Sequence, residues 1–490
     1  MRETTARGRR RTRRSRERNA MENVTKVQVV MFPLPPIGHL VTTVELAKIL
    51  IHNHSLLSIT ILTPQDHPFD APTTAPYIAR ISASYSPTRL RFLNLAPVHF
   101  SPTPDMRSQT IRSLFVAAHK PLVAEALKSL STPSSPVRAF ITDFFCTNLL
   151  EAAEEADVPC YLFFTSGANL LSLMLYLPTL HDQIPCEFRD CKNPIPVPGL
   201  PPVPAIDLPL VLQDRTNDAY KWFLYHAGRL RESKGIIINT FAELEPLTLK
   251  ALREGLCLPN HPTPPIYTVG PLLNLDDQPA GGEGHECLRW LDKQPHGSVV
   301  FLCFGSLGAF PAHQTNEIAL GLEQSGQRFL WSLRTTSHDS EPLPEGFLER
   351  TQGYGMVWPK WVPQVAVLTH PAVGGFVSHC GWNSTLESLC HGVPMVAWPL
   401  SAEQRLNALV LVRELGVALE MEMAEDGVVR AEALGSRVRA LMEEEEGRRV
   451  RKRAKELKAA AMKVVEEGGS SQSSLKAAIH EILKAGVVSV

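Results

Sequence analysis

Short apolar runs alternate with stretches of helical periodicity along most of this chain, and this alternation constrains its fold more than any other feature. The candidate strands lie at 27–32, 59–62, 137–142, 235–239, 298–304, 328–333, 374–378 and 393–398. Such alternation is typical of a parallel sheet with helices on both faces. Because the pattern starts again in the second half, the sequence predicts two doubly wound α/β domains.

The boundary between the two domains is marked by a change in composition. The stretch NLDDQPAGGEGHE at 274–286 is polar and glycine-rich, which is typical of a linker or a surface loop. We therefore predict a first domain at 21–269 and a second at 270–470, followed by helical residues at 471–490.

Composition excludes several classes of protein. The chain has 490 residues, of which 44% are hydrophobic and 20% charged, as expected for a globular enzyme. A net charge of −1 argues against a nucleic-acid or membrane-surface role. No apolar run reaches the roughly 18 residues of a membrane span. The nine cysteines show no CxxC spacing, which indicates free thiols in a reducing compartment. We predict a cytoplasmic monomer without nucleic-acid partners.

The first twenty residues differ from the rest of the chain. Residues 1–20 hold nine arginines and almost nothing apolar, so we expect disorder. A nuclear or transit signal and a nucleic-acid tail are possible functions of such a segment. We favour an upstream extension, with Met21 as the working start. The apolar run that follows is too short for a secretory signal.

The segment GGFVSHCGWNSTLESLCHGVP at 374–394 predicts a strand, a turn and a short helix. Ser384 and Glu387 have the spacing of a capping box, and Gly392 ends the helix. A helix that opens just after a strand presents backbone N–H groups and a positive dipole end, which suit phosphate. His379 lies at that opening and can add a side-chain donor. The segment is therefore suited to a charged nucleotide.

His39 is the first candidate for catalysis. It follows the strand at 27–32 and the turn PLPPIG, and it opens a helix. Ligands bind at the carboxyl ends of strands in open α/β sheets. A helix N-terminus disfavours the imidazolium, so a neutral ring could accept a proton from a phenol. Position alone supports a helix-capping histidine equally well.

Asp143 is the second candidate. It follows the strand at 137–142 and precedes the apolar run FFC, so its carboxylate needs a partner. A histidine at a neighbouring strand end could be that partner, and the carboxylate would then fix the imidazole tautomer. Taken alone, the position also fits an aspartate that caps a helix.

The stretch WVPQVAVLTHPAVGGFVSHCGWNSTLESLCHGVPMVAWPLSAEQ at 361–404 resembles the plant secondary product glycosyltransferase box, the donor-sugar signature of family 1 UDP-glycosyltransferases. The resemblance extends from about Val27 to the C-terminus. QDRTNDAYKWFLYHAGRLRESKGIIINTFAELEP and PLPEGFLERTQG are most similar to the group that glucosylates hydroquinone and other small phenols. The resemblance implies the GT-B fold, in which two Rossmann-like domains face a cleft and the last helix packs back on the N-terminal domain.

The resemblance also implies roles for individual residues. His39 is the expected general base and Asp143 its partner. The expected donor contacts are Trp361, Val362 and Gln364 at the uracil, Glu387 at the ribose, Ser306, His379, Asn383 and Ser384 at the diphosphate and sugar, and Thr165, Trp382, Glu403 and Gln404 around the sugar. Without the resemblance, Ser306 also fits an ordinary turn serine, Trp361 a core tryptophan and Glu387 a capping residue. In the family, a glutamine at the position of Gln404 accompanies a preference for glucose as the donor sugar.

Three positions depart from the family pattern. Leu34 stands where relatives often have a small polar residue, and Pro36 where they often have glycine, so one donor contact of the first loop is in doubt. Ser401 replaces a frequent aromatic residue, which widens the acceptor side. We expect acceptor binding mainly by the first domain, through loops such as SPTPDMRS at 101–108 and FFTSGANLLSLMLYLP at 163–178.

The predicted reaction is one in-line displacement without a cofactor. His39 removes a phenolic proton, and the phenolic oxygen attacks C1 of UDP-α-glucose. UDP departs as the leaving group, and the product is a β-glucoside. The sequence contains no Asp-x-Asp motif, which disfavours a metal-dependent transferase. One alternative is a nucleotide-dependent oxidoreductase, although PLPPIGH stands where GxGxxG would follow the first strand. The other is a non-catalytic sugar-nucleotide sensor. The sequence leaves two points open: which phenol is the acceptor, and whether the sugar is transferred to oxygen or to nitrogen.

Overall fold

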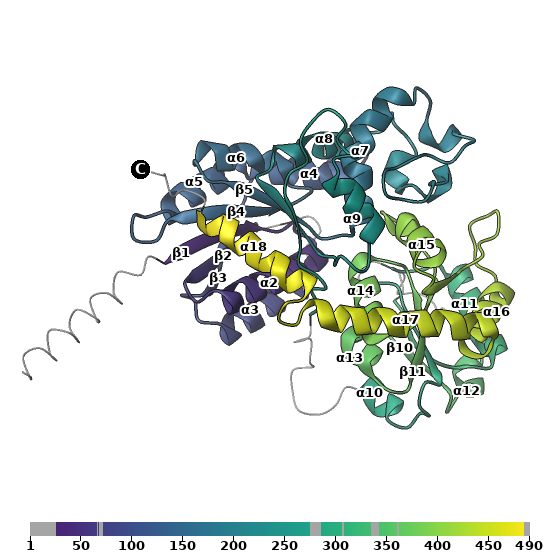
Figure 1. Cartoon of the computed structure of the whole chain (residues 1–490). Helices are drawn as coiled ribbons and strands as arrows, with labels where there is room; N and C mark the ends of the chain where they lie inside the picture. The colour runs from purple at the N-terminus through teal and green to yellow at the C-terminus, as the bar shows by residue number, and fades with distance from the viewer. Residues whose placement is uncertain are drawn as a thin grey trace, which may run out of the picture. The chain divides into compact units, whose positions relative to one another are not determined.

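The computed structural model describes residues 26–65, 67, 72–274, 286–305, 308–334, 343–359 and 362–484. Their strands form a seven-stranded sheet in the order β3-β2-β1-β4-β5-β6-β7 and a six-stranded sheet in the order β10-β9-β8-β11-β12-β13 (Figure 1). Neighbouring strands pair in parallel throughout the second sheet and, in the first, in the pairs β1–β2, β1–β4, β2–β3 and β6–β7. The two parallel sheets predicted from the alternation are therefore confirmed.

The strands of the first sheet are short and apolar, as are those of the second. Their bounds are β1 Val27–Phe32, β2 Leu57–Thr63, β3 Leu90–Asn94, β4 Val137–Asp143, β5 Cys160–Phe164, β6 Gly235–Ile238, β7 Ile266–Thr268, β8 Val299–Cys303, β9 Arg328–Ser332, β10 Gly355–Trp358, β11 Val373–Ser378, β12 Met395–Ala397 and β13 Ala418–Glu420.

Helices connect these strands, as parallel pairing requires. Their bounds are α2 Ile37–Asn53, α3 Thr74–Ser84, α4 Ser108–Ala118, α5 Lys120–Leu130, α6 Leu150–Glu155, α7 Ala168–Gln183, α8 Asp218–Arg229, α9 Pro246–Arg253, α10 Glu286–Leu291, α11 Ala312–Ser325, α12 Phe347–Arg350, α13 Gln364–Thr369, α14 Trp382–His391, α15 Gln404–Arg413, α16 Ala431–Glu443, α17 Glu445–Val464 and α18 Ser470–Lys484. Short 3₁₀ turns are η1 Thr147–Leu149, η2 Phe188–Asp190, η3 Ala205–Asp207, η4 Leu210–Leu212 and η5 Leu230–Glu232.

Each sheet reverses its strand order at one point. The chain builds outward from β1 to β3 and then places β4 on the other side of β1, and it repeats this with β8, β10 and β11. In open α/β sheets, ligands bind outside the carboxyl ends of the strands at such a reversal. His39 follows β1 and His379 follows β11. Both candidate positions therefore lie at a reversal point.

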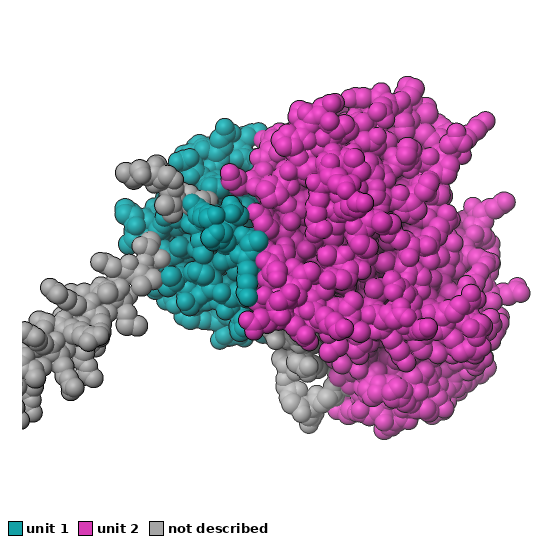
Figure 2. Space-filling view, viewed as in Figure 1, with its two compact units in different colours: residues 1–101, 114–161, 476–490 teal, residues 102–113, 162–475 magenta. Residues whose placement is uncertain are grey.

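Contacts divide the chain into two compact units (Figure 2). Unit 1 comprises 1–101, 114–161 and 476–490, and unit 2 comprises 102–113 and 162–475. These units are cut at other points than the predicted domains at 21–269, 270–470 and 471–490. The predicted division stays a prediction.

Each unit has buried apolar clusters that include side chains of its strands. In unit 1, Val30, Phe32 and Phe140 belong to one buried cluster. In unit 2, Phe301 and its neighbour Leu302 on β8 belong to two different buried clusters. Since successive side chains of a strand point to opposite faces, both faces of the second sheet are covered.

One predicted loop is wrong. The segment at 163–178 ends β5 at Phe164 and starts α7 at Ala168, and most of α7 is buried. Its leucines recur at helical spacing, a signal that outweighs the turn chemistry of Ser166 and Gly167. Within the residues that the structure describes, no helix is long and apolar enough to cross a membrane.

Candidate active site

His39 and Asp143 are brought together by the pairing of two strands. β1 and β4 are parallel neighbours, with Phe32 opposite Thr142. Asp143 ends β4, and His39 lies in the first turn of α2, just beyond β1. The carboxyl ends of parallel strands meet at the same sheet edge, so the two side chains meet there. His39 Nδ1 lies 2.7 Å from Asp143 Oδ2.

The environment of this pair sets the tautomer of the histidine. The Asp143 side chain is fully buried, whereas that of His39 is 25% exposed. Asp143 Oδ1 accepts a hydrogen bond from the backbone N–H of Phe145 at 2.9 Å. Because a carboxylate accepts, His39 Nδ1 donates, which leaves the basic lone pair on Nε2.

The sequence allowed a helix-capping role for both His39 and Asp143, and the structure gives a different answer for each. Pro36 is the N-cap of α2, and no side-chain bond caps that helix in the described structure, so capping does not explain His39. Asp143 does accept a backbone N–H two residues on. Its second oxygen nevertheless contacts His39, so it serves both purposes.

A strained turn joins β11 to α14. Cys380 has a φ of 63°, a left-handed conformation that costs a non-glycine residue on the order of 1–3 kcal/mol. Asn407 Nδ2 donates to the carbonyl of Cys380 at 2.9 Å, and the Cys380 N–H donates to Ser378 Oγ at 3.2 Å. Gly381 is then the N-cap of α14. The turn presents the first backbone N–H groups of a ten-residue helix, an arrangement that suits an anion.

His379 is packed into this turn. A Cβ at Gly381 would lie 2.4 Å from His379 Nε2, and one at Gly305 would lie 2.6 Å from it, so both positions require glycine. Burial lowers the pKa of His379 to about 4. Its Nδ1 is buried and has no hydrogen-bond partner among the described residues. A neutral ring with an unsatisfied buried nitrogen is a polar group in need of a ligand.

Gln364 connects the two residues that we expected to form a capping box. Gln364 Nε2 donates to Ser384 Oγ at 2.8 Å and to Glu387 Oε2 at 2.6 Å. The predicted capping box is wrong, because α14 begins at Trp382 with Gly381 as its N-cap. Ser384 and Glu387 lie three residues apart on the same face of the helix, where Gln364 reaches both.

Glu403 and Gln404 lie at the start of α15. Glu403 is its N-cap, and Glu403 Oε1 accepts a hydrogen bond from Ser166 Oγ at 3.4 Å. Gln404 Oε1 accepts from the backbone N–H groups of Leu400 and Ser401 at 2.8 Å each. The amide of Gln404 is thus oriented by its own turn, and its Nε2 also donates to Ser401 Oγ at 3.4 Å.

The chain is similar to known proteins over most of its length. The model of the family "UDP-glucoronosyl and UDP-glucosyl transferase" matches residues 256–445. "Anthocyanidin 5,3-O-glucosyltransferase" of a Rosa hybrid cultivar is 43% identical over 91% of this chain and 97% of its own. "Malvidin galactosylase UGT88C3" of Oryza sativa subsp. japonica is 42% identical over 95% and 100%. The structure of Phytolacca americana UGT2 with UDP-2fluoro-glucose and pterostilbene superposes with a TM-score of 0.85 at 38% identity, over 93% of this chain and 99% of that one.

The chain belongs to the plant family 1 UDP-glycosyltransferases. This glycosyltransferase has the GT-B architecture of two parallel-sheet, Rossmann-like domains, and its co-substrate is a UDP-sugar. The predicted hydroquinone subgroup is not confirmed, because relatives named for their acceptors are anthocyanidin and flavonoid enzymes. The monomeric state and the cytoplasmic location stay predictions.

Four predicted donor contacts of the glycosyltransferase need comment. Ser306 and Trp361 lie outside the described residues. Val362 is buried in an apolar cluster, so its backbone is the part that could face a ligand. Trp382 is also buried, and its indole N–H donates to the carbonyl of Asn239 at 2.7 Å. Trp382 therefore packs the site, and its indole N–H is already engaged.

The remaining donor contacts stay predictions. Asn383 follows Trp382 in the first turn of α14. Thr165 is buried, directly before Ser166. The three departures from the family pattern are Leu34, which is buried, Pro36, which is half-buried, and Ser401, which is exposed.

Sequence reasoning missed two asparagines that support the site. Asn239 ends the apolar run GIIIN; its backbone carbonyl accepts from the indole of Trp382, and its side-chain Oδ1 accepts from the N–H of Leu272. Asn407, in the apolar helix α15, holds the carbonyl of Cys380. A polar amide inside an apolar run is the signal that could have identified both, because such a group must find a partner when buried.

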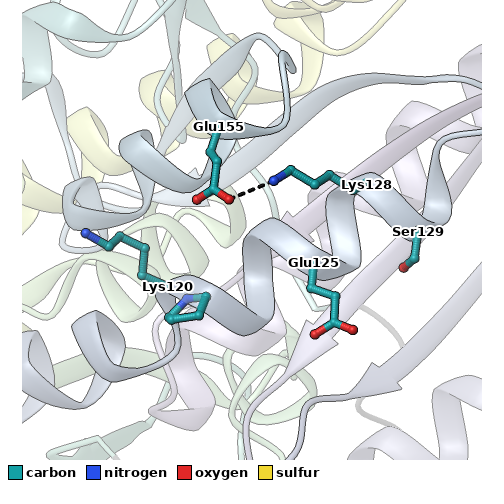
Figure 3. A pocket seen from close by; sticks show the side chains of 6 residues that line it. Lys120, Glu125, Lys128, Ser129 and Glu155 are labelled. Atoms are coloured by element: carbon teal, nitrogen blue, oxygen red, sulfur yellow. Dashed lines mark hydrogen bonds and ion pairs between the residues drawn. The ribbon is translucent and has the colours of Figure 1, made fainter.

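A separate hollow lies over α5 and α6 (Figure 3). It is lined by Lys120, Pro121, Glu125, Lys128, Ser129 and Glu155, and Lys128 Nζ lies 2.7 Å from Glu155 Oε1. None of the predicted site residues lines it. Its exposed charges are compensated by one another, so it does not indicate a binding site for this glycosyltransferase.

Proposed function

We propose that this protein transfers glucose from UDP-glucose to a hydroxyl group of a small phenolic acceptor, with inversion, to give a β-O-glucoside. The observation that carries the proposal is the 2.7 Å contact between His39 Nδ1 and Asp143 Oδ2 at the strand reversal of the first sheet. A buried carboxylate that orients an imidazole is the arrangement of a general base.

The chemistry follows from the tautomer. Asp143 holds the proton on Nδ1, so His39 Nε2 takes the proton of the acceptor hydroxyl as its oxygen attacks C1 of glucose. The bond from C1 to the diphosphate oxygen breaks as the new bond forms, and UDP leaves. Asp143 then stabilises the imidazolium. A single displacement of this kind inverts the configuration at C1.

The donor would be held by unit 2. The first N–H groups of α14 and the imidazole of His379 suit the diphosphate, whose negative charge grows as UDP leaves. The carboxylate of Glu387, oriented by Gln364 at 2.6 Å, suits the two hydroxyls of ribose. We assign the uracil to Trp361 by resemblance.

The sugar would be read by Glu403 and Gln404. A carboxylate and an amide with fixed positions discriminate between epimers, because a misplaced hydroxyl leaves a buried polar group unpaired. Ser166 and the backbone of Leu400 and Ser401 supply that fixed geometry. A relative is named as a galactosylase, so the choice of glucose needs its own test.

The acceptor is the least constrained part of the proposal. The relatives are named for anthocyanidin and malvidin, and the superposed structure holds pterostilbene. All three are phenolic. These names support a phenolic acceptor, and hydroquinone is one member of that class.

An acceptor and donor screen tests the proposal. The protein begun at Met21 is incubated with UDP-glucose or UDP-galactose and with hydroquinone, a flavonol, an anthocyanidin or an aromatic amine. We expect a glucoside by mass spectrometry, with a β-anomeric proton coupling by NMR, from at least one phenol. Exclusive transfer to nitrogen, exclusive use of UDP-galactose or an α-linked product would contradict it.

Two binding measurements address the alternative functions. Calorimetry with UDP-glucose and with NADPH separates a transferase from an oxidoreductase, and we expect binding of the sugar nucleotide alone. Tight binding of UDP-glucose without transfer to any acceptor in the screen would instead favour a sensor.

A further inference from the structure

Glu245 is a buried carboxylate that the proposed mechanism does not use. It is 1% exposed and precedes α9, yet its two oxygens face the first turn of another helix, α7. Oε2 accepts from the backbone N–H of Ala168 at 2.8 Å, and Oε1 accepts from Asn169 through its N–H at 2.9 Å and its Nδ2 at 2.7 Å. Thr240 Oγ1 donates to Oε2. Four donors thus converge on one carboxylate.

This arrangement supplies a cap that α7 cannot make for itself. The N-cap of α7 is Gly167, which has no side chain. A carboxylate at a helix N-terminus satisfies backbone N–H groups and opposes the positive end of the dipole. Burial raises the pKa of Glu245, and the hydrogen bonds from Thr240, Ala168 and Asn169 act in the opposite direction. The position of α7 is therefore set by a residue 77 positions away in the chain.

The same junction contacts the donor helix. A Cβ at Gly167 would lie 2.7 Å from Trp382 Cη2 and 2.8 Å from Glu245 Oε1, so Gly167 is wedged between them. Trp382 is the first residue of α14 and donates from its indole to Asn239, the residue before Thr240. One loop, 239–245, therefore holds both the start of α7 and the start of α14.

The residues just before α7 also contact the start of α15, where Glu403 and Gln404 are expected to bind the sugar. Ser166, two residues before Ala168, donates to Glu403 Oε1 at 3.4 Å. A shift of the first turn of α7 would move Ser166 and remove the group that orients Glu403. It would also disturb the packing of Trp382.

We infer that Glu245 is a positioning residue for the hexose half of the donor site, acting through α7 on Ser166, Glu403 and Trp382. The inference rests on the proposed function. It assigns to Glu245 the selectivity for the sugar but not the affinity for the nucleotide, because the start of α14 is also held by the bond from Trp382 to the Asn239 carbonyl, and the expected ribose contact Glu387 is held by Gln364.

Glu245→Gln tests this inference. An amide keeps the shape but presents an NH₂ group to N–H donors, so α7 loses part of its cap. We expect kcat/KM for UDP-glucose to fall about tenfold or more, the worth of a hydrogen bond to a charged group, and the preference for UDP-glucose over UDP-galactose to fall with it. The Kd of UDP, measured by calorimetry, should stay within about twofold.

Ser172→Ala is the matched control. Ser172 is buried in the same helix and donates to the carbonyl of Pro198 at 2.6 Å, so its loss destabilises α7 without touching the first turn. We expect it to lower the melting temperature and leave the donor preference unchanged. Glu245→Asp, which keeps the charge, should recover part of the preference.

Two outcomes would overturn the inference. One is a folded Glu245→Gln variant whose donor preference equals that of Ser172→Ala, and the other is an equal loss of affinity for UDP and UDP-glucose. If Glu245→Gln does not fold, Thr240→Val removes one donor and keeps the carboxylate, and the same measurements apply. A wild-type protein that neither binds nor uses UDP-glucose would instead refute the proposed function.

Discussion

At the residue scale, the pair His39 and Asp143 shows how the proposed catalytic group is oriented by the fold itself. The two residues are 104 positions apart, and the carboxylate is fully buried while the imidazole stays partly exposed. Burial strengthens the hydrogen bond between them, because the surrounding dielectric is low. The partial exposure of the His39 side chain lets a substrate approach the ring.

His39→Ala should lower kcat by about 10²–10⁴, the usual contribution of a general base. The Kd of UDP should not change, because its contacts lie on other residues. Steady-state kinetics with the best acceptor and calorimetry with UDP check both points. Turnover close to that of the wild type would remove His39 from the mechanism.

Asp143→Asn should preserve the bond to the Phe145 N–H through the amide oxygen but offer an NH₂ group to His39. The histidine would then favour the opposite tautomer, with its proton on Nε2 and no base facing the acceptor. We expect a loss in kcat on the order of 10²–10⁴ with an unchanged melting temperature. A normal kcat and pH profile would show that Asp143 has only a structural role.

At the scale of elements, the strand–turn–helix unit β11–α14 carries most of the predicted contacts to the diphosphate. Its turn combines a strained Cys380, a glycine N-cap and a buried imidazole. Gly392 in the left-handed region ends the helix after ten residues. The sequence predicted this unit and its end correctly. It misplaced the N-cap, because Ser384 bonds to Gln364 from the first turns of the helix and does not stand before it.

Gly381→Ala should weaken UDP binding about tenfold or more, since the added Cβ would lie 2.4 Å from His379 Nε2 and displace the ring. Backbone strain would not cause this loss, because Gly381 has a φ of −63°, which any residue can adopt. Gly228→Ala is the control, since a Cβ there meets nothing within 4 Å. Calorimetry with UDP compares the two variants. Equal affinities would exclude a role for the position of His379.

At the scale of the whole molecule, two buried histidines couple folding to pH. Burial lowers the pKa of His379 to about 4 and that of His226 to about 3, from 6.5. Their folded pKa values lie below the unfolded value, so the unfolded chain binds protons that the folded chain does not. The resulting stability is complete above pH 6.5 and is lost as the pH falls toward 4.

We expect the contribution of His379 to the free energy of unfolding to fall by about 3 kcal/mol over that range. Urea unfolding between pH 6.5 and pH 4 measures it. His379→Asn should make the decline shallower, with His226 still contributing. An identical slope in the variant would show that His379 does not resist protonation.

Treatment with EDTA should leave glucosyl transfer unchanged, because positive charge for the diphosphate is expected from the helix dipole and hydrogen-bond donors. Initial rates before and after chelation, with Mn²⁺ added back, check this. A loss that Mn²⁺ restores would require a metal in the mechanism.

The local pattern of residues was enough to predict the fold class, most strands and the segments that carry the chemistry. Periodicity and turn residues act over a few positions, so they can be read directly from the chain. The strands β3, β5, β7 and β13 were missed, and two of them, β7 and β13, have only three residues each and give too little pattern. Residue-by-residue roles beyond this came from the resemblance of 361–404 to a known family.

The family resemblance implied the pair His39 and Asp143, and folding alone established the other partners. Gln364 joins Ser384 to Glu387, and Trp382 donates to an asparagine 143 positions away. Glu245 caps a helix that begins 77 residues before it. These contacts depend on strand order and helix packing, which bring distant segments to one sheet edge. No local pattern encodes that order, so only the folded chain reveals the pairs.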